Sequence, residues 1–305
     1  MSFSSEVKKE LSHAPMENEH DCAAEIAGFI TFGGEIHLTE AGNLDILFRS
    51  ENSVVAERFI ALNQKLGFVV EQGKMPHDYL VIGEKSKMHL LKLCGFMDNL
   101  GRLVEEEEIF ENTLLQNNTC QRAFLRGAFL ACGSITDPEK NYHFEITCNS
   151  ETIACMLKDQ MEFFGLEAKI VLRKKYYVVY MKEGSMISEM LAIMEGHISK
   201  LNFENIRIFK DVRNVVNRRV NCETANINKT VSAARKQIED IEYIEKTIGL
   251  KGLPESLRAI ASARLEEPSA TLKELGERLQ PPVGKSGVNH RLRKISQIAQ
   301  ELRDK

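Results

Sequence analysis

The chain has 305 residues, 43% of them apolar, which is enough for about two average domains whose cores need no disulfide support. Its apolar stretches, such as residues 26–32, are too short to span a bilayer, and residues 1–10 lack the apolar region of a signal peptide. These features exclude a single small module. They predict a soluble, cytoplasmic protein with no membrane partner.

The cysteines and histidines follow no metal-binding or redox pattern. There are 7 cysteines, an odd number, without a Cys-x-x-Cys pair, and the 8 histidines include no His-Glu-x-x-His motif. We therefore expect reduced, mostly buried thiols, no dedicated metal site and no cofactor.

The net charge of -4 is divided unevenly along the chain. Residues 205–305 carry 20 Lys or Arg and 13 Asp or Glu, whereas residues 1–204 carry 20 and 31. A basic end on an acidic chain indicates a polyanionic partner, which for a cytosolic protein points to nucleic acid. The alternative is an ordinary basic surface without a ligand.

An internal repeat runs through the acidic part. Residues 28–36 match residues 127–135 at an offset of 99, and the match continues in 53–68 with 151–166, 79–82 with 177–180, and 89–98 with 187–196. Each copy reads as a helix, a strand pair, a second helix, another strand or hairpin, and a final helix. The sequence thus predicts a tandem α/β pair. The acidic run 105–108 and the residues after it are expected to form a largely solvated connector.

Two segments of the repeat, residues 26–34 and 125–133, resemble the LAGLIDADG helices of homing endonucleases. Small side chains would let the two helices approach closely at a pseudo-twofold interface; they are Ala27, Gly28, Gly127 and Ala131.

The same resemblance implies that the nuclease chemistry has been lost. In those enzymes the acid at the eighth motif position of each helix binds a divalent metal, and Gly33 and Cys132 stand there in this chain. Neither is the oxygen ligand that Mg²⁺ requires. Glu35 is a possible displaced ligand, but Ser134 occupies the matching place in the second copy.

The basic end begins with a helical linker over residues 206–252. Apolar residues from Ile227 to Ile248 recur at spacings of three and four, which predicts one long amphipathic helix ended by Gly249 and Gly252. This helix packs on its own chain or pairs with a second copy, so the oligomeric state stays open.

Residues 253–305 show the pattern of a helix-turn-helix domain. A helix over 254–265 precedes a short helix that Ser269 or Thr271 can cap, and a turn at 280–284 precedes a third helix that Ser286 can cap.

The third helix is predicted to contact DNA because residues 280–299 contain five Lys, Arg or His residues and no Asp or Glu. Near its start, Ser286, Asn289, His290 and Arg293 are expected to face base edges. Phosphate contacts are expected from Thr271, Lys273, Lys285, Arg291 and Lys294, with auxiliary contacts from Arg213, Arg218 and Arg219 of the linker.

Residues 2–8, 124–130, 217–226 and 285–294 are similar to motifs of the WhiA family, and the last two are long and specific. This resemblance implies a duplicated α/β LAGLIDADG-endonuclease-like domain joined by a long helical linker to an all-α helix-turn-helix domain. The expected boundaries are 1–111, 112–205, 206–252 and 253–305. It also implies a DNA-binding transcriptional regulator of cell division, chromosome segregation and, in spore formers, sporulation.

The predicted partner is double-stranded DNA, and the predicted location is the cytoplasm, in association with the nucleoid. Two other classes of function are alternatives to this non-enzymatic regulator. One is a nucleic-acid-processing endonuclease that uses the duplicated domain, where Arg173, Lys174 and Lys175 lie on a predicted strand. The other is a protein-interaction scaffold whose acidic domain docks a partner and whose DNA binding is incidental.

Overall fold

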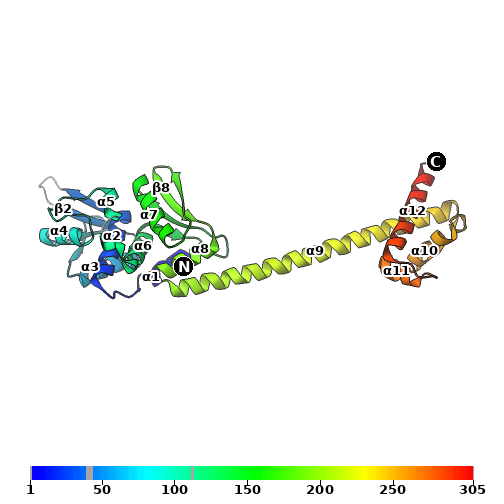
Figure 1. Ribbon diagram of the computed structural model, residues 1–305, viewed down its shortest axis with the longest axis horizontal. Helices are drawn as coiled ribbons and strands as arrows, with labels where there is room; N and C mark the ends of the chain where they lie inside the picture. The colour runs from blue at the N-terminus through cyan, green and yellow to red at the C-terminus, as the bar shows by residue number, and fades with distance from the viewer. Residues whose placement is uncertain (1, 39–43, 111–112, 305) are drawn as a thin grey trace. The chain divides into compact units, whose positions relative to one another are not determined.

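The computed structural model describes residues 2–38, 44–110 and 113–304, and the chain forms two compact units, residues 1–211 and 212–305 (Figure 1). The first unit is α/β and the second is entirely helical. The predicted fold class is therefore confirmed. No helix among the described residues is both long and apolar enough to cross a membrane.

The first unit contains two copies of one motif. In each copy a helix leads into a four-stranded antiparallel sheet, with order β1-β2-β4-β3 in the first copy and β5-β6-β8-β7 in the second. After the N-terminal helix α1 (Phe3–Leu11), the first copy consists of α2 (Glu19–Gly33), β1 (Gly34–Leu38), β2 (Leu44–Arg49), α3 (Ser53–Lys65), β3 (Val70–Gln72), β4 (Asp78–Val81) and α4 (Glu84–Leu93). The second consists of α6 (Asn118–Cys132), β5 (Gly133–Ile135), β6 (Phe144–Cys148), α7 (Glu151–Phe163), β7 (Lys169–Arg173), β8 (Tyr176–Met181) and α8 (Gly184–Ile193).

The first helix of each copy, α2 or α6, lies at the centre of the unit (Figure 1). Both are capped by asparagine: the Asn18 side chain accepts from the Asp21 amide, and that of Asn117 accepts from the Thr119 amide. Each packs an aromatic ring on its own sheet, Phe29 on Phe48 and Phe129 on Phe144, both with ring centroids 5.2 Å apart.

Glycine allows the two central helices to touch. A β-carbon added at Gly28 would lie 2.3 Å from the Phe124 carbonyl oxygen, and one at Gly127 would lie 2.2 Å from that of Glu25. Any side chain at either position would therefore force the helices apart. The close approach predicted from the small residues is confirmed.

Several predicted boundaries in this unit are wrong. Helices α4 and α8 each begin before the predicted residues 89 and 187 and end before residues 98 and 196. The acidic connector contains the short helix α5 (Glu106–Phe110) and the 3-10 turn η1 (Thr113–Gln116), and Ile109 is buried. Lys174 and Lys175 lie in the turn between β7 and β8 rather than on a strand.

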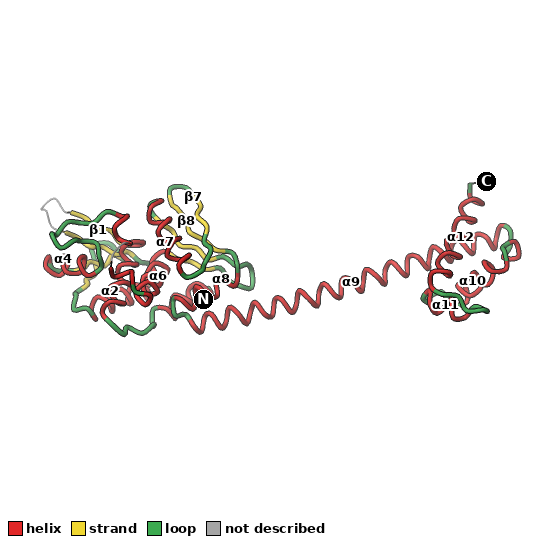
Figure 2. The backbone as a smooth tube through the Cα atoms, in the orientation of Figure 1, coloured by secondary structure: helices red, strands yellow, loops and turns green. Residues whose placement is uncertain are grey.

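The second unit is built on the end of one long helix. Helix α9 (His197–Thr247) begins in the first unit, and its last turns join the core of the second. After it come η2 (Leu250–Gly252), α10 (Glu255–Glu266), α11 (Leu272–Arg278) and α12 (Lys285–Arg303). Figure 2 shows α9, α10, α11 and α12 as helices. Ile241 and Ile244 of α9 are fully buried in the same cluster as Ile260, Leu275 and Leu292. Apolar burial thus fastens the short helices to α9.

The turn between α11 and α12 depends on one glycine. The Val283 amide donates to the Gly276 carbonyl at 3.0 Å, and a β-carbon at Gly276 would lie 2.0 Å from the Val283 oxygen. Since only glycine allows the turn to lie this close to α11, Gly276 sets where α12 starts.

Two details of this unit differ from expectation. Helix α9 begins at His197, thirty residues before the predicted Ile227, and its side chains from 211 to 233 are all exposed. Helix α12 begins at Lys285 with Gly284 as its N-cap, so Ser286 lies inside the first turn and does not cap it. Thr271 does cap α11, through a capping box with Glu274.

Candidate nucleic-acid interface

Helix α12 presents a basic face at its start. Its inner side is fixed by buried Val288, Leu292 and Ile295, and the opposite side carries exposed Ser286, His290, Arg293 and Lys294. The described helix holds no acid before Glu301. The one-sign face is therefore a property of the folded helix and not only of the sequence.

Four of the predicted contact residues gather around one hollow. A cavity of about 500 Å³, which we call the cationic pocket, is lined by Thr271, Lys273, Lys285 and Asn289 together with residues of α9 and α10. Asn289 is only half exposed because it forms part of this wall. Thr271 uses its hydroxyl oxygen to accept from the Glu274 amide at 3.3 Å, so capping already engages one of its lone pairs.

The remaining predicted residues lie elsewhere. Arg291 directs its Nη1 toward the Ser256 carbonyl of α10, 3.5 Å away, so the structure does not place it on the exposed face with Arg293. Arg213, Arg218 and Arg219 are exposed on α9, and Arg219 pairs with Glu223 at 3.2 Å. They precede the first pocket residue of α9, Lys229, by ten residues or more, which is roughly 15 Å along a helix.

The other residues that line the pocket were not predicted, and they include two cations and a glutamine. Lys229 and Gln237 come from α9, and Arg264 comes from the end of α10. The sequence does contain one indication of Arg264, because it continues the apolar series Leu257, Ile260, Ala261 at helical spacing and so places a cation on the buried face.

Residues 33 and 132, which were predicted to match the catalytic acids of the LAGLIDADG motif, lie in packed surroundings. A β-carbon at Gly33 would lie 3.0 Å from the Phe48 ring and 3.1 Å from the Ala131 β-carbon. The Cys132 thiol donates to the Phe32 carbonyl at 2.9 Å, and burial raises the pKa of this thiol although the Lys8 charge opposes the rise. Carboxylates are absent from both positions.

Nearby groups do not replace those carboxylates. The Lys8 ammonium donates to the Leu130 carbonyl at 3.0 Å and lies 5.7 Å from the centre of the Phe129 ring. Glu35 is on the exposed strand β1, where its carboxylate pairs with His37 at 2.9 Å. Among the described residues no group of three or more His, Cys, Asp or Glu side chains is arranged to hold a metal ion.

The chain matches two family models, the WhiA LAGLIDADG-like domain over residues 121–213 and the WhiA C-terminal HTH domain over residues 216–299. It is 44% identical over 312 residues to a "Probable cell division protein WhiA" of Lachnoclostridium phytofermentans, covering 99% of this chain and 100% of that protein.

The chain belongs to the WhiA family.

Two further comparisons extend over the whole length of WhiA proteins. The "Probable cell division protein WhiA" of Lachnospira eligens is 44% identical over 314 residues, covering 99% of this chain and 98% of that one. The crystal structure of full-length WhiA from Thermatoga maritima has a TM-score of 0.60 and 26% sequence identity, covering 99% of both chains. The resemblance to WhiA is thus confirmed in both sequence and fold, and the helix-turn-helix and degenerate LAGLIDADG-like parts are both present.

Proposed function

We propose that this WhiA protein is a transcriptional regulator that binds double-stranded DNA with sequence preference through α12. The observation that carries the proposal is the exposed start of α12, where Ser286, His290, Arg293 and Lys294 meet no acid of that helix before Glu301. Arg can bond guanine and Asn can bond adenine through two hydrogen bonds each, so Arg293 and Asn289 would supply sequence preference. Lys273, Lys285 and Lys294 would hold phosphates.

The biological role follows from the family. The curated relatives are named as probable cell division proteins. We infer that this chain acts in cell division, at the nucleoid and in the cytoplasm. We infer that its role also includes chromosome segregation and, in a spore-forming host, sporulation. The division into residues 1–111, 112–205, 206–252 and 253–305 is part of the same proposal.

We further propose that the chain does not cut DNA. Glycine and cysteine at positions 33 and 132 supply no hard oxygen ligand, and the packing of Phe48 and Ala131 against Gly33 leaves little room for a longer side chain. A cleavage mechanism that depends on a carboxylate from each central helix has no residue to use at these positions.

The test compares DNA binding by the full chain and two variants, Asn289→Ala and Arg293→Ala. Binding to enriched genomic fragments should weaken by about 5- to 150-fold for each variant, corresponding to roughly 1–3 kcal/mol per lost base contact, while binding to unrelated duplexes changes little. Gln297→Ala, also exposed on α12 but further from its start, is the matched control. Equal loss on all sequences would refute base reading.

The same samples decide between regulation and cleavage. The full chain is incubated with the fragments and Mg²⁺, and intact DNA is expected. A nicked or cut product that disappears on substitution in the first unit would return the function to the duplicated domain. Truncation before α10 is a poor alternative, because it would uncover Ile241 and Ile244, which are buried in the helix-turn-helix core.

A further inference from the structure

The charged side chains that line the cationic pocket are all of one sign. Four of its lining side chains are basic, Lys229, Arg264, Lys273 and Lys285, and none is acidic. Lys273 has a distant partner in Glu277, at 3.8 Å, and that pair is exposed to solvent. Four cations around one hollow repel one another, and no carboxylate in the pocket lining balances their charge.

Burial of Arg264 increases the free-energy cost of this missing negative charge. Arg264 is 2% exposed, and its Nη1 donates to the Ala270 carbonyl at 2.6 Å, but its Nε has no hydrogen-bond partner. Among the described residues it has no carboxylate partner, and burial lowers the pKa of its guanidinium without any opposing acid. A buried cation without a counter-charge is unfavourable unless something outside the protein supplies that charge.

The start of α12 adds to the positive electrostatic potential of the cationic pocket. Lys285 is the first residue of this 19-residue helix, and the N-cap, Gly284, provides no side chain to accept from the first-turn amides. The unsatisfied amides and the helix dipole place partial positive charge at this end, where oxyanions bind well. The helix start and the buried arginine are independent features, and both favour an anion.

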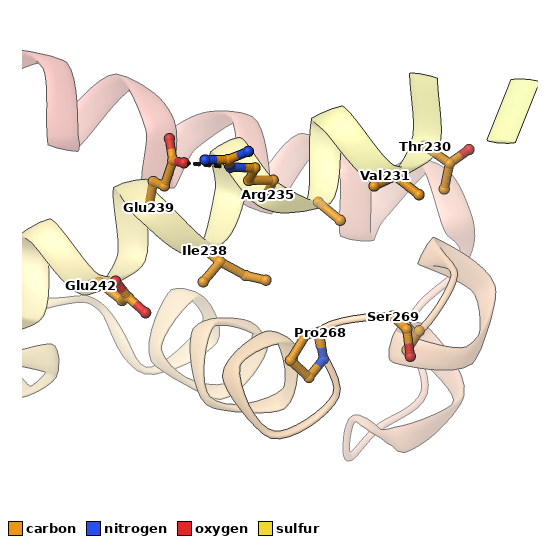
Figure 3. A pocket seen from close by; sticks show the side chains of 10 residues that line it. Thr230, Val231, Arg235, Ile238, Glu239, Glu242, Pro268 and Ser269 are labelled. Atoms are coloured by element: carbon orange, nitrogen blue, oxygen red, sulfur yellow. Dashed lines mark hydrogen bonds and ion pairs between the residues drawn. The ribbon is translucent and has the colours of Figure 1, made fainter. Parts of the chain in front are cut away.

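A second cavity beside it shows the contrast (Figure 3). It shares Thr230 and Ala234 with the cationic pocket, but its walls are mostly apolar, with Ile238 facing Pro268, and they include the carboxylates of Glu239 and Glu242. The second cavity also has a basic residue, Arg235, but its guanidinium pairs with the Glu239 carboxylate at 3.0 Å. Of these two cavities, only the cationic pocket has basic lining without an acid.

We propose that the cationic pocket binds a phosphate group. Lys229, Lys273 and Lys285 hold the phosphate at the surface, and its negative charge compensates the buried positive charge of Arg264. The polar side chains of Gln237 and Asn289 complete the walls, and the volume of about 500 Å³ falls within the roughly 300–1,000 Å³ of small-molecule sites. The phosphate comes either from the backbone of bound DNA, in which case the inference rests on the proposed function, or from a free phosphorylated compound that would compete with DNA for Lys285 and Asn289.

The experiment uses the full chain, the variant Lys229→Gln, and the control Lys236→Gln. Both lysines are exposed on α9, two turns apart, and Lys236 does not line the pocket. Unchanged thermal unfolding of both variants establishes that each is folded. Calorimetric titration with pyrophosphate at constant ionic strength tests the free source, and duplex binding at several salt concentrations tests the DNA source.

A free phosphorylated ligand predicts saturable pyrophosphate binding that weakens about tenfold in Lys229→Gln and is unchanged in Lys236→Gln. A DNA phosphate predicts no pyrophosphate binding. Instead, Lys229→Gln raises the Kd for every duplex by about fivefold at 0.15 M salt and lowers the slope of log K against log salt by about 0.9, the value for one lost phosphate contact.

The inference is overturned if Lys229→Gln and Lys236→Gln behave alike in both assays. If the unsubstituted chain binds no duplex at all, the proposed function fails, and the pyrophosphate titration alone then decides whether the pocket binds phosphate.

Discussion

The buried ion cluster around Glu25, in the middle of α2, allows the sharpest stability prediction. The Glu25 carboxylate, 1% exposed, accepts hydrogen bonds from Nε and Nη2 of Arg58, both at 2.8 Å, and from Nε and Nη2 of Arg126, at 3.0 and 2.8 Å. Arg126 comes from the second copy, so the cluster joins the two halves of the duplicated domain. Although burial lowers the pKa of Arg126, the charge and hydrogen bonds of Glu25 outweigh it and raise that pKa.

The perturbation is Glu25→Gln, which keeps the shape and removes the charge. Arg126 retains Glu195, 2.7 Å away, but Arg58 is left with backbone carbonyls alone. Breaking a buried pair from one side costs about 3–5 kcal/mol, because it leaves an uncompensated charge. For a unit of this size, at about 2–4 °C per kcal/mol, the melting temperature should fall by roughly 6–20 °C.

The assay is thermal unfolding of the full chain followed by circular dichroism. The control is Glu162→Gln on α7. It breaks the ion pair between the Glu162 carboxylate and the Lys158 ammonium, 2.7 Å apart at the surface, and should leave the melting temperature unchanged. In an Arg58→Met, Arg126→Met background, Glu25→Gln should lower the melting temperature much less, because no arginine remains there to be left without a counter-charge. A loss for Glu25→Gln no greater than that of the control would refute the reasoning.

Three further predictions concern the turn, the thiols and pH. Gly276→Ala should unfold the second unit and abolish DNA binding, whereas Gly284→Ala, whose new β-carbon meets nothing within 4 Å, should retain both when unfolding and DNA binding are measured together. A thiol reagent at pH 8 should react rapidly with exposed Cys155 and Cys222 but not with Cys120, whose pKa is raised to about 11 by burial and by Asp21; a fast phase that survives Cys155→Ser, Cys222→Ser would contradict this. The pKa of Glu145 lies below its usual 4.5, because the His143 hydrogen bond and the Arg173 charge outweigh partial burial. Its stabilising contribution is present above that value and lost as pH falls through the folded pKa, so Glu145→Gln should lower the melting temperature at pH 7 and have a progressively smaller effect as the pH falls below 4.5.

The architecture of both units was predictable because it follows from local patterns. The repeat predicted the order of helices and strands in each half, and the small residues of α2 and α6 indicated where the halves would touch. Boundaries were wrong where the sequence carries no stop or start residue. Helices α4 and α8 begin without a side-chain cap, because their N-cap residues are Gly83 and Glu183 rather than Ser, Thr, Asp or Asn.

The start of α9 was missed for a different physical reason. An amphipathic pattern reveals a helix only where one face is buried, and residues 211–233 are exposed on all sides. Apolar residues there, such as Val212 and Val216, face solvent in this chain. Their spacing therefore gives no information about a core, and the helix continues through them by backbone hydrogen bonding alone.

The cationic pocket lay beyond sequence reasoning because its residues come from four helices. Thr271, Lys273, Lys285 and Asn289 were each assigned to DNA contact from their places on α11 and α12, but nothing in the sequence brings Lys229 or Arg264 beside them. Only packing does so, when Ile241 and Ile244 anchor the end of α9 against the helix-turn-helix core.

The central helices explain how the first unit keeps a nuclease-like fold without nuclease residues. Gly28 and Gly127 are required by backbone contact, and Glu25 is required by two buried arginines, so each is constrained by stability alone. Positions 33 and 132 have no such constraint in favour of an acid. At the first the neighbours fill the space, and at the second the thiol satisfies a backbone carbonyl. An acid introduced at position 33 would have to displace Phe48, which costs stability. Packing therefore accounts for the duplicated scaffold and leaves little room for an acid at position 33.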